Sequence, residues 1–287
     1  MNDKATVTLY TAPLVIPVTG PVICDGAVAV RDGRVLHVGT RDWVEQKLRD
    51  DRKDAGDVET RNWHGLVTPG LVNAHTHLQY TGMASVGQST YPSFRDWELA
   101  FNKIYDSPER KPWREWAHEG ARMMVEAGTT AAADIASDLE AADALTSQGM
   151  HGITYWEVMD WNNEDWQRKG VQDLLAQIEV IRSMGVTEIG ISPHAPYSLG
   201  SGPLLDLPDI ARRLGMRLHV HLGETPAEAG KLPSKLTNQT SWAWNRTEWS
   251  GFNDLKRAGA GASAIQFLDQ LAVLGPDVHI AHGVHAS

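Results

Sequence analysis

The chain has 287 residues, is 42% hydrophobic, carries a formal charge of −10 and contains one cysteine, Cys24. A single cysteine excludes an intrachain disulfide and a thiolate metal cluster, and the sequence shows neither an apolar stretch long enough to cross a bilayer nor a secretory signal. Because no Lys/Arg run exceeds two residues, a nucleic-acid partner is also excluded, and we expect a cytoplasmic protein that binds neither nucleic acid nor membrane.

Short β segments predominate in residues 1–67. Alternating apolar residues predict strands at 5–10, 26–31 and 34–39, and the Asp32-Gly33 pair between the last two is typical of a tight hairpin. A short helix is expected around 43–48. We therefore predict that residues 1–67 form the N-terminal part of a small β-sandwich module.

From residue 68 onward, short apolar runs alternate with longer helical stretches, the pattern of βα units in a parallel sheet. The predicted strands are 71–77, 129–135, 152–158, 188–194, 217–222 and 278–283, and the predicted helices between them are 113–127, 139–147, 171–184, 205–214 and 263–274. This succession predicts an α/β fold, a (β/α)8 TIM-type barrel over residues 68–287. Only six of its eight strands are found, so we expect the barrel to be incomplete at its C-terminal side.

His75 and His77 stand at alternate positions of the first predicted barrel strand, so their side chains point to one face. Two imidazoles on one face can hold a metal ion, and they lie toward the C-terminal end of the strand, where barrel enzymes carry out their chemistry. The alternative is a pair of core histidines satisfied within the protein. We favour metal ligands.

His219 and His221 form a second such pair on the strand at 217–222. A third imidazole from this pair would give the three protein ligands of a catalytic zinc site and leave a position for water. Glu224 follows the strand closely enough to act on that water as a general acid or base. The alternative for Glu224 is a carboxylate at the N-terminus of a following helix.

Two other strand ends carry a histidine. His282 ends the strand at 278–283 and is preferred to His279, which lies earlier in that strand. His194 ends the strand at 188–194 between two prolines that hold the backbone extended, and we expect it to contact substrate.

Together these strand ends resemble the amidohydrolase superfamily, in particular the branch that contains cytosine deaminases, aromatic-amine deaminases and triazine chlorohydrolases. The shared pattern is Pro-Gly-x-x-Asn-x-His-x-His at the first strand, His-x-x-Glu at the fifth and a histidine after the sixth. The residues that match it are Pro69, Gly70, Asn73, His75, His77, His221, Glu224 and His282.

The resemblance implies one divalent metal ion bound by His75, His77 and His221. Zn2+ is the preferred ion and Fe2+ the alternative. It implies that Glu224 moves a proton from the activated water to the substrate and that His282 orients the attacking group. Family members also have an aspartate at the end of the eighth strand. Since the sequence stops four residues after its sixth strand, we expect the chain to be part of a longer enzyme.

The resemblance further implies hydrolytic deamination of a small heteroaromatic substrate, purine nucleoside-like and possibly aminodeoxyfutalosine, by a homodimer. Gln79 and Trp97, in the segment after the first strand, are the candidate substrate contacts, although Trp97 can equally pack a helix on the barrel. The long segment 231–262 is expected to lie over the site. Two alternatives stay open: hydrolysis of a carbon–chlorine or cyclic amide bond, and a non-catalytic structural or partner chain.

Overall fold

The computed structural model describes residues 6–51, 57–229 and 263–286, and the chain divides into two compact units, Met1–Leu71 and Val72–Ser287. The division falls a few residues after the boundary expected from the sequence. The segment expected over the site, 231–262, lies outside the described residues.

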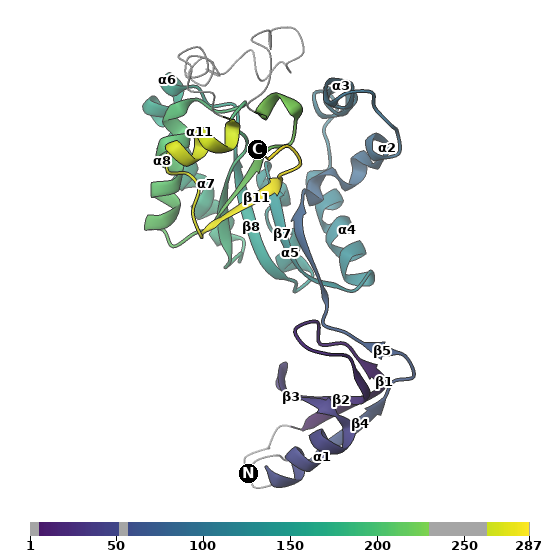
Figure 1. The fold of residues 1–287 in the computed structure, drawn as a ribbon. Helices are drawn as coiled ribbons and strands as arrows, with labels where there is room; N and C mark the ends of the chain where they lie inside the picture. Colours follow the sequence, from purple (N-terminus) through teal and green to yellow (C-terminus); the bar gives the residue numbers. More distant parts are fainter. Residues whose placement is uncertain (1–5, 52–56, 230–262, 287) are drawn as a thin grey trace. The chain divides into compact units, whose positions relative to one another are not determined.

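The first unit is built on one five-stranded sheet (Figure 1). Its strands run in the order β3-β2-β1-β4, with β5 paired to β1. Their bounds are β1 Val7–Val15, β2 Ile23–Arg31, β3 Arg34–Thr40, β4 Val58–Asn62 and β5 Leu66–Val67. The predicted hairpin joins β2 to β3, and Asp32 and Gly33 both have positive φ values, 51° and 71°, as such a tight turn requires.

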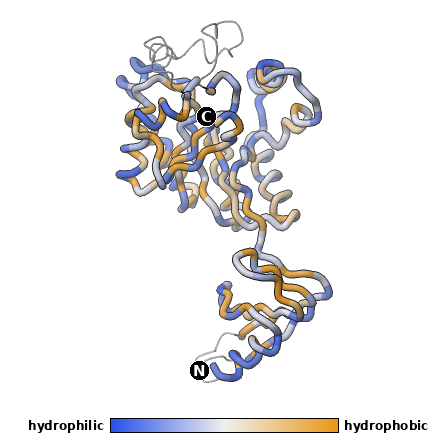
Figure 2. The backbone as a smooth tube through the Cα atoms, viewed as in Figure 1, coloured by the Kyte–Doolittle hydropathy of each residue, from blue (hydrophilic) through white to orange (hydrophobic). Residues whose placement is uncertain are grey.

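Helix α1 (Arg41–Asp50) covers one face of this sheet. Its buried residues Val44 and Leu48 form a small core with Val7, Leu9 and the two alanines of β2. The sequence predicts a β-sandwich, in which a second sheet forms the other layer. In the described part of the unit, that layer is helix α1. Figure 2 shows that α1 is otherwise hydrophilic, as a helix with one buried stripe should be.

The second unit contains the predicted six-stranded sheet, which is confirmed. Its order follows the sequence from β6 to β11, and the registers from β7 to β11 are all parallel. The strands are β6 Leu71–Thr76, β7 Thr129–Ala136, β8 His151–Val158, β9 Ile189–Pro193, β10 Leu218–Leu222 and β11 Val278–His282. Because these strands are parallel, their C-terminal ends all lie at the same edge of the sheet.

Helices connect these strands, and most of them pack on the outside of the sheet, whereas the helices at 84–87 and 94–105 lie away from it (Figure 1). Their bounds are α2 Ala84–Gly87, α3 Phe94–Tyr105, α4 Trp113–Glu126, α5 Ala144–Ser147, α6 Asn163–Asp165, α7 Val171–Ser183, α8 Ser201–Arg213 and α11 Ala264–Gln270. The prediction of one helix over 139–147 is wrong, because a 3-10 turn at Leu139–Ala141 precedes the single turn of α5. Helix α8 begins four residues earlier than predicted, with Pro203 in its first turn, where a missing N–H costs nothing.

The main core lies between β8, β9 and β10 and the helices outside them. Ile191, Leu218 and Val220 on the strands pack with Leu174 of α7 and Leu207 of α8, all nearly inaccessible to solvent. A smaller core joins β7 to α4 and α5. Because alternate strand residues face this outer core, the remaining ones face the inside of the sheet, where the histidines lie.

Candidate active site

A cavity of about 310 Å3 lies at the C-terminal ends of the barrel strands. Seven of the eight site residues predicted from the sequence line it: His75, His77, Trp97, His194, His221, Glu224 and His282. The exception is Gln79, which is buried behind the wall. Its amide donates to the hydroxyl of Ser137, and its carbonyl accepts from the backbone N–H of Ser137 at 3.0 Å. The structure therefore places Gln79 as a support of the β7 end, not at the cavity surface.

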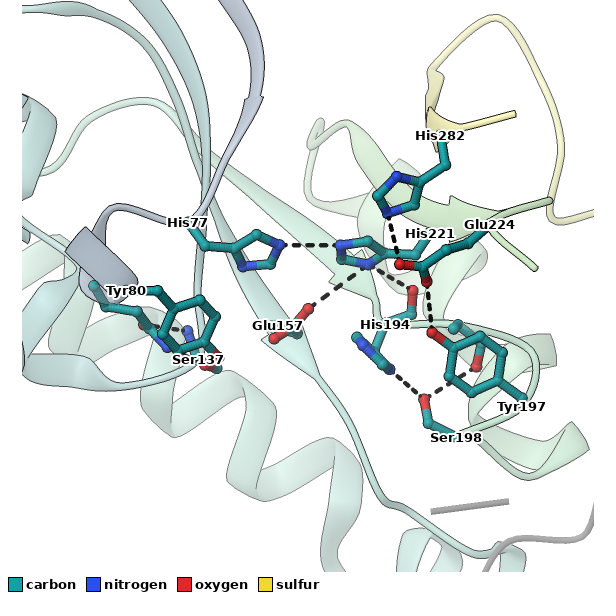
Figure 3. Close-up of polar contacts among 12 residues, drawn as sticks. His77, Tyr80, Ser137, Glu157, His194, Tyr197, Ser198, His221, Glu224 and His282 are labelled. Atoms are coloured by element: carbon teal, nitrogen blue, oxygen red, sulfur yellow. Dashed lines mark hydrogen bonds and ion pairs between the residues drawn. The ribbon is translucent and has the colours of Figure 1, made fainter. Parts of the chain in front are cut away.

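The histidines at the strand ends form one packed cluster. The ring centroid of His75 lies 5.1 Å from that of His77, 5.0 Å from His221 and 5.2 Å from His282. The ring centroids of His77 and His221 also lie 5.1 Å apart, and their Nε2 atoms are separated by 3.0 Å (Figure 3). The i, i+2 spacing at the C-terminal end of β6 and in β10 thus brings these imidazoles together.

Burial keeps these imidazoles neutral. It lowers the pKa of His75 from 6.5 to about 4, with a smaller contribution from His282, and it lowers the pKa of His77 and His221 well below 6.5, with neighbouring histidines adding to the effect. A neutral imidazole offers the lone pair that a metal ion needs. The same burial that would be costly for a protonated histidine therefore suits a ligand.

Hydrogen bonding fixes the direction of the His221 lone pair. The Nδ1–H of His221 donates to the backbone carbonyl of His194 at 3.0 Å, so Nε2 carries the lone pair and points toward His77. Backbone carbonyls orient metal-binding histidines in this way in many proteins. Among the described residues, the buried Nδ1 atoms of His75 and His77 have no hydrogen-bond partner.

Two overlapping sets of residues offer ligand atoms within 4.8 Å of one another: His75, His221 and His282, and His77, Glu157 and His221. His221 belongs to both. The three ligands predicted from the sequence are therefore all in the cluster, but His75 and His77 fall into different sets. Neutral imidazoles with a carboxylate are a donor set that fits zinc or iron(II), so the residues present fit the implied metal ion.

Glu224 lies at the cavity surface next to His282. Its Oε2 accepts from the hydroxyl of Tyr197 at 2.8 Å, and its Oε1 lies 3.4 Å from Nε2 of His282. Burial raises the pKa of Glu224, while the Tyr197 hydrogen bond opposes this. A carboxyl group whose pKa is moved toward neutrality is suited to proton transfer.

The helix-capping role considered for Glu224 belongs instead to Glu228. Glu228 accepts from the backbone N–H groups of Gly223 and Thr225, each at 2.9 Å, and from the Thr225 hydroxyl at 3.1 Å. Gly223 has a φ of 67°, a conformation that turns the chain sharply after β10. Glu228 and Gly223 together hold the turn so that Glu224 faces the cavity.

His194 and Trp97 both line the cavity. The Nδ1 of His194 lies within hydrogen-bond distance of the Ser198 hydroxyl, at 2.6 Å, and this hydroxyl also donates to the Ala195 carbonyl at 3.2 Å. Trp97 lies on α3, stacked on Phe101 with ring centroids 5.4 Å apart. Trp97 thus belongs to a helix and its ring also lines the cavity, and its contact with substrate stays a prediction.

Tyr197 and Glu157 are among the cavity residues that were not predicted from the sequence. Tyr197 follows β9 and donates to Glu224, and Glu157 is the next-to-last residue of β8. Burial, with Asp160 and Glu224 nearby, raises the pKa of Glu157 from 4.5 to about 8. The signal for Glu157 was present in the sequence, since a carboxylate inside an apolar run such as Thr154–Val158 is costly without a purpose.

Comparison with known proteins places this fold in a class. A sequence profile of the amidohydrolase family matches residues 66–242. The chain therefore belongs to the amidohydrolase family, and its six strands are those of the family's TIM-type barrel.

Among curated relatives, the chain is 27% identical over 279 residues to a 5-methylthioadenosine/S-adenosylhomocysteine deaminase of Moorella thermoacetica, covering 94% of this chain and 56% of the relative. It is 24% identical over 266 residues to a 5'-deoxyadenosine deaminase of Methanopyrus kandleri, covering 92% of this chain and 55% of the relative. The chain thus spans a little over half the length of these relatives.

Solved structures share the fold at lower identity. The Helicobacter pylori aminofutalosine deaminase in complex with methylthio-coformycin superimposes with a TM-score of 0.71 at 16% identity, over 98% of this chain and 65% of that one. A zinc complex of the Arthrobacter aurescens atrazine chlorohydrolase gives 0.70 at 17% identity, over 96% and 60%. In the described part of the chain, no helix is long and apolar enough to span a membrane.

Proposed function

We propose that this protein is a metal-dependent hydrolase that deaminates a small heteroaromatic, purine nucleoside-like substrate. One observation carries the proposal: neutral, buried imidazoles from β6 and β10 meet at the same cavity as Glu224 and His282. A cavity with several groups whose pKa is strongly shifted and which converge on one point is typical of a catalytic centre. The names of the curated relatives, all deaminases of adenosine derivatives, support the substrate class.

The residues that would hold the metal ion are His75, His77 and His221. Zinc is the preferred ion and iron(II) the alternative, because both accept imidazole nitrogen. When bound, such an ion lowers the pKa of water to about 7 and so supplies a nucleophile at neutral pH. The His194 carbonyl keeps the Nε2 atom of His221 unprotonated for this purpose.

Glu224 would carry the proton of the reaction. Its carboxyl group would take one proton from the attacking water and deliver it to a ring nitrogen of the substrate; the second proton of the water would then pass to the amine, which departs as ammonia. Tyr197 holds one carboxyl oxygen, which leaves the other directed toward His282 (Figure 3). His282 would orient the attacking water, and its positive φ of 71° is a strained conformation of the kind kept at functional positions.

The substrate ring would bind against the aromatic side chains of the cavity. Phe94, Trp97, Phe101 and Tyr105 succeed one another on α3 with centroid separations of 5.4 to 5.5 Å, and all four line the cavity. Rings stacked on one another in this way present a row of apolar ring edges, against which a heteroaromatic ring can pack. His194, which also lines the cavity, would contact the substrate.

The experiment uses the complete natural chain, purified and analysed for bound metal. The apoprotein and the zinc- and iron(II)-loaded protein are incubated with 5'-deoxyadenosine, 5'-methylthioadenosine and aminofutalosine, and ammonia release is measured. Metal-dependent release from at least one compound is the expected result.

The protein could instead release chloride from a chlorotriazine or open a cyclic amide, with no ammonia from any aminated ring. That result would show that it catalyses the corresponding hydrolysis and not deamination. A protein that binds no zinc or iron(II) and turns over none of these compounds would contradict the enzyme proposal altogether.

A further inference from the structure

Glu157 is a buried carboxyl group of the cavity to which the mechanism above gives no role. It is the next-to-last residue of β8, and its side chain lies on the inner face of the sheet with that of Tyr155, whose ring lies 4.9 Å from the ring of His219. Trp156 and Val158, at the alternate positions, belong to the outer core. Strand geometry thus directs Glu157 to the cavity that it lines.

The carboxyl group is incompletely satisfied. Its side chain is only 2% exposed, and its Oε1 has no hydrogen-bond partner among the described residues. Buried carboxyl oxygens are nearly always hydrogen-bonded, because leaving one without a partner costs free energy. A buried polar atom that faces a cavity and lacks a protein partner indicates that a ligand supplies one.

The position of Glu157 relative to His221 bears on whether the missing partner of its carboxyl group is the metal ion or the substrate. Oε1 of Glu157 lies 3.8 Å from Nδ1 of His221, whereas Nε2 of the same ring faces His77 at 3.0 Å (Figure 3). Nδ1 is already engaged by the His194 carbonyl. Glu157 is therefore nearest to the Nδ1 edge of the His221 ring, although a carboxylate oxygen of Glu157 also lies within 4.8 Å of ligand atoms of His77 and His221.

Packing against the aromatic side chains of α3 does not fix the orientation of the substrate ring. A flat ring held between aromatic side chains can rotate in its own plane with little change in stacking energy, so polar contacts at its edge must set its orientation. Glu224 provides one such contact from the turn after β10. Glu157, on β8, reaches the same cavity from a different strand.

We propose that Glu157 is a specificity-determining residue that hydrogen-bonds a ring nitrogen of the heteroaromatic substrate. The inference rests on the proposed function and adds to it the group that orients the ring. Two carboxyl groups from separate strands then fix the ring in its plane, one for proton transfer and the other for recognition. A site built to hydrogen-bond a substrate atom discriminates strongly against an analogue that lacks it.

The test measures kcat/KM for 5'-methylthioadenosine and for its 1-deaza, 3-deaza and 7-deaza analogues, in each of which carbon replaces one ring nitrogen. The 1-deaza compound also lacks the nitrogen next to the amino-bearing carbon, which Glu224 would protonate, so the role of Glu157 is judged from the 3-deaza and 7-deaza compounds. Wild type should disfavour the analogue that lacks the contacted nitrogen by about 10- to 100-fold. In Glu157→Leu this discrimination should shrink to within about threefold. Glu157→Gln keeps a donor and an acceptor and should retain most of it.

Asp134→Asn is the matched control. Asp134 is a buried carboxyl group near the end of the neighbouring strand β7, but it accepts from the backbone N–H of Leu78 at 2.9 Å and does not line the cavity. This variant should keep the wild-type ratio between the analogues, whatever its absolute rate. Bound zinc is measured in every variant and should be the same in Glu157→Leu as in wild type.

Two results would overturn the inference. An equal loss on all four compounds in Glu157→Leu would make the residue structural, and a fall in bound zinc would make it a metal ligand together with His77 and His221. If wild type releases ammonia from none of the compounds, the proposed function fails. Calorimetric binding of the same four compounds then decides the role of Glu157: loss of discrimination in Glu157→Leu supports it, and unchanged or absent binding refutes it.

Discussion

Replacing Glu228 by glutamine should destabilise the second unit and misplace Glu224. Glu228 is 1% exposed and accepts three hydrogen bonds, two of them from backbone N–H groups that flank Glu224 in sequence. In Glu228→Gln, the amide oxygen can still accept on one side, but the NH2 group then faces an N–H donor on the other. At least one hydrogen bond to a charged group is lost and one buried donor is left without an acceptor.

The two losses set the magnitude. A hydrogen bond to a charged group contributes about 1.5–3 kcal/mol, and an unsatisfied buried donor costs about 1–3 kcal/mol, so a net loss of about 3 kcal/mol is expected. For a unit of this size, that corresponds to a fall of about 6–12 °C in the midpoint of thermal unfolding. Circular dichroism measures the midpoint, and kcat, measured well below it, reports the displacement of Glu224.

Glu188→Gln is the control, because Glu188 is exposed and precedes β9. Surface substitutions of this kind change stability by less than about 0.5 kcal/mol. If Glu228→Gln and Glu188→Gln had the same unfolding midpoint and the same kcat, the capping network would not hold the turn, and the reasoning from its hydrogen bonds would be refuted.

Three further predictions concern the site. His221→Ala should lower zinc affinity at least about 100-fold in a chelator competition. The control is His118→Ala, because His118 lies outside the cavity and is paired with Asp143 at 2.9 Å. Equal zinc affinities of the two variants would contradict the assignment of His221 as a ligand. Glu224→Gln should lower kcat by about 10^2- to 10^4-fold with zinc content unchanged, and near-normal kcat would remove Glu224 from proton transfer. Burial raises the pKa of Asp134 from 3.8 to about 7, so the folded state holds this proton more tightly. Protonated Asp134 therefore stabilises the folded state below about pH 4. This stabilisation falls by up to about 1.4 kcal/mol per pH unit as the pH rises from about 4 to about 7. Asp134→Asn should flatten the unfolding free energy over that range, and a parallel profile would show that the pKa is not raised.

The sheet and the histidine cluster could be predicted from the sequence because both depend on short-range periodicity. Apolar runs separated by helical stretches define the parallel strands, and the i, i+2 spacing of His75 with His77 and of His219 with His221 puts each pair on one face. Parallel strands then bring the pairs to one edge without further information. The cavity is the consequence of these two local patterns.

Residues just beyond the strands could not be placed in this way. Gln79 falls in the 3-10 turn that follows β6, and this turn directs its side chain to Ser137 behind the cavity wall. Glu228, not Glu224, satisfies the backbone after β10, a choice that depends on the turn conformation at Gly223. Such placements depend on dihedral angles and tertiary contacts, which a periodic pattern does not encode.

Helix α3 differs from the strands around the cavity in how little of it is buried. None of its twelve residues is buried, although its aromatic side chains succeed one another along the cavity wall. Its folding therefore gains little from the core, and its backbone amides should exchange with solvent deuterium faster than those of β8 to β10. A ring bound against these side chains would bury apolar surface on the helix that the empty protein leaves exposed. Binding would thus be visible as slower amide exchange in α3, with the exchange of the sheet unchanged, so the helix itself reports whether the cavity is filled.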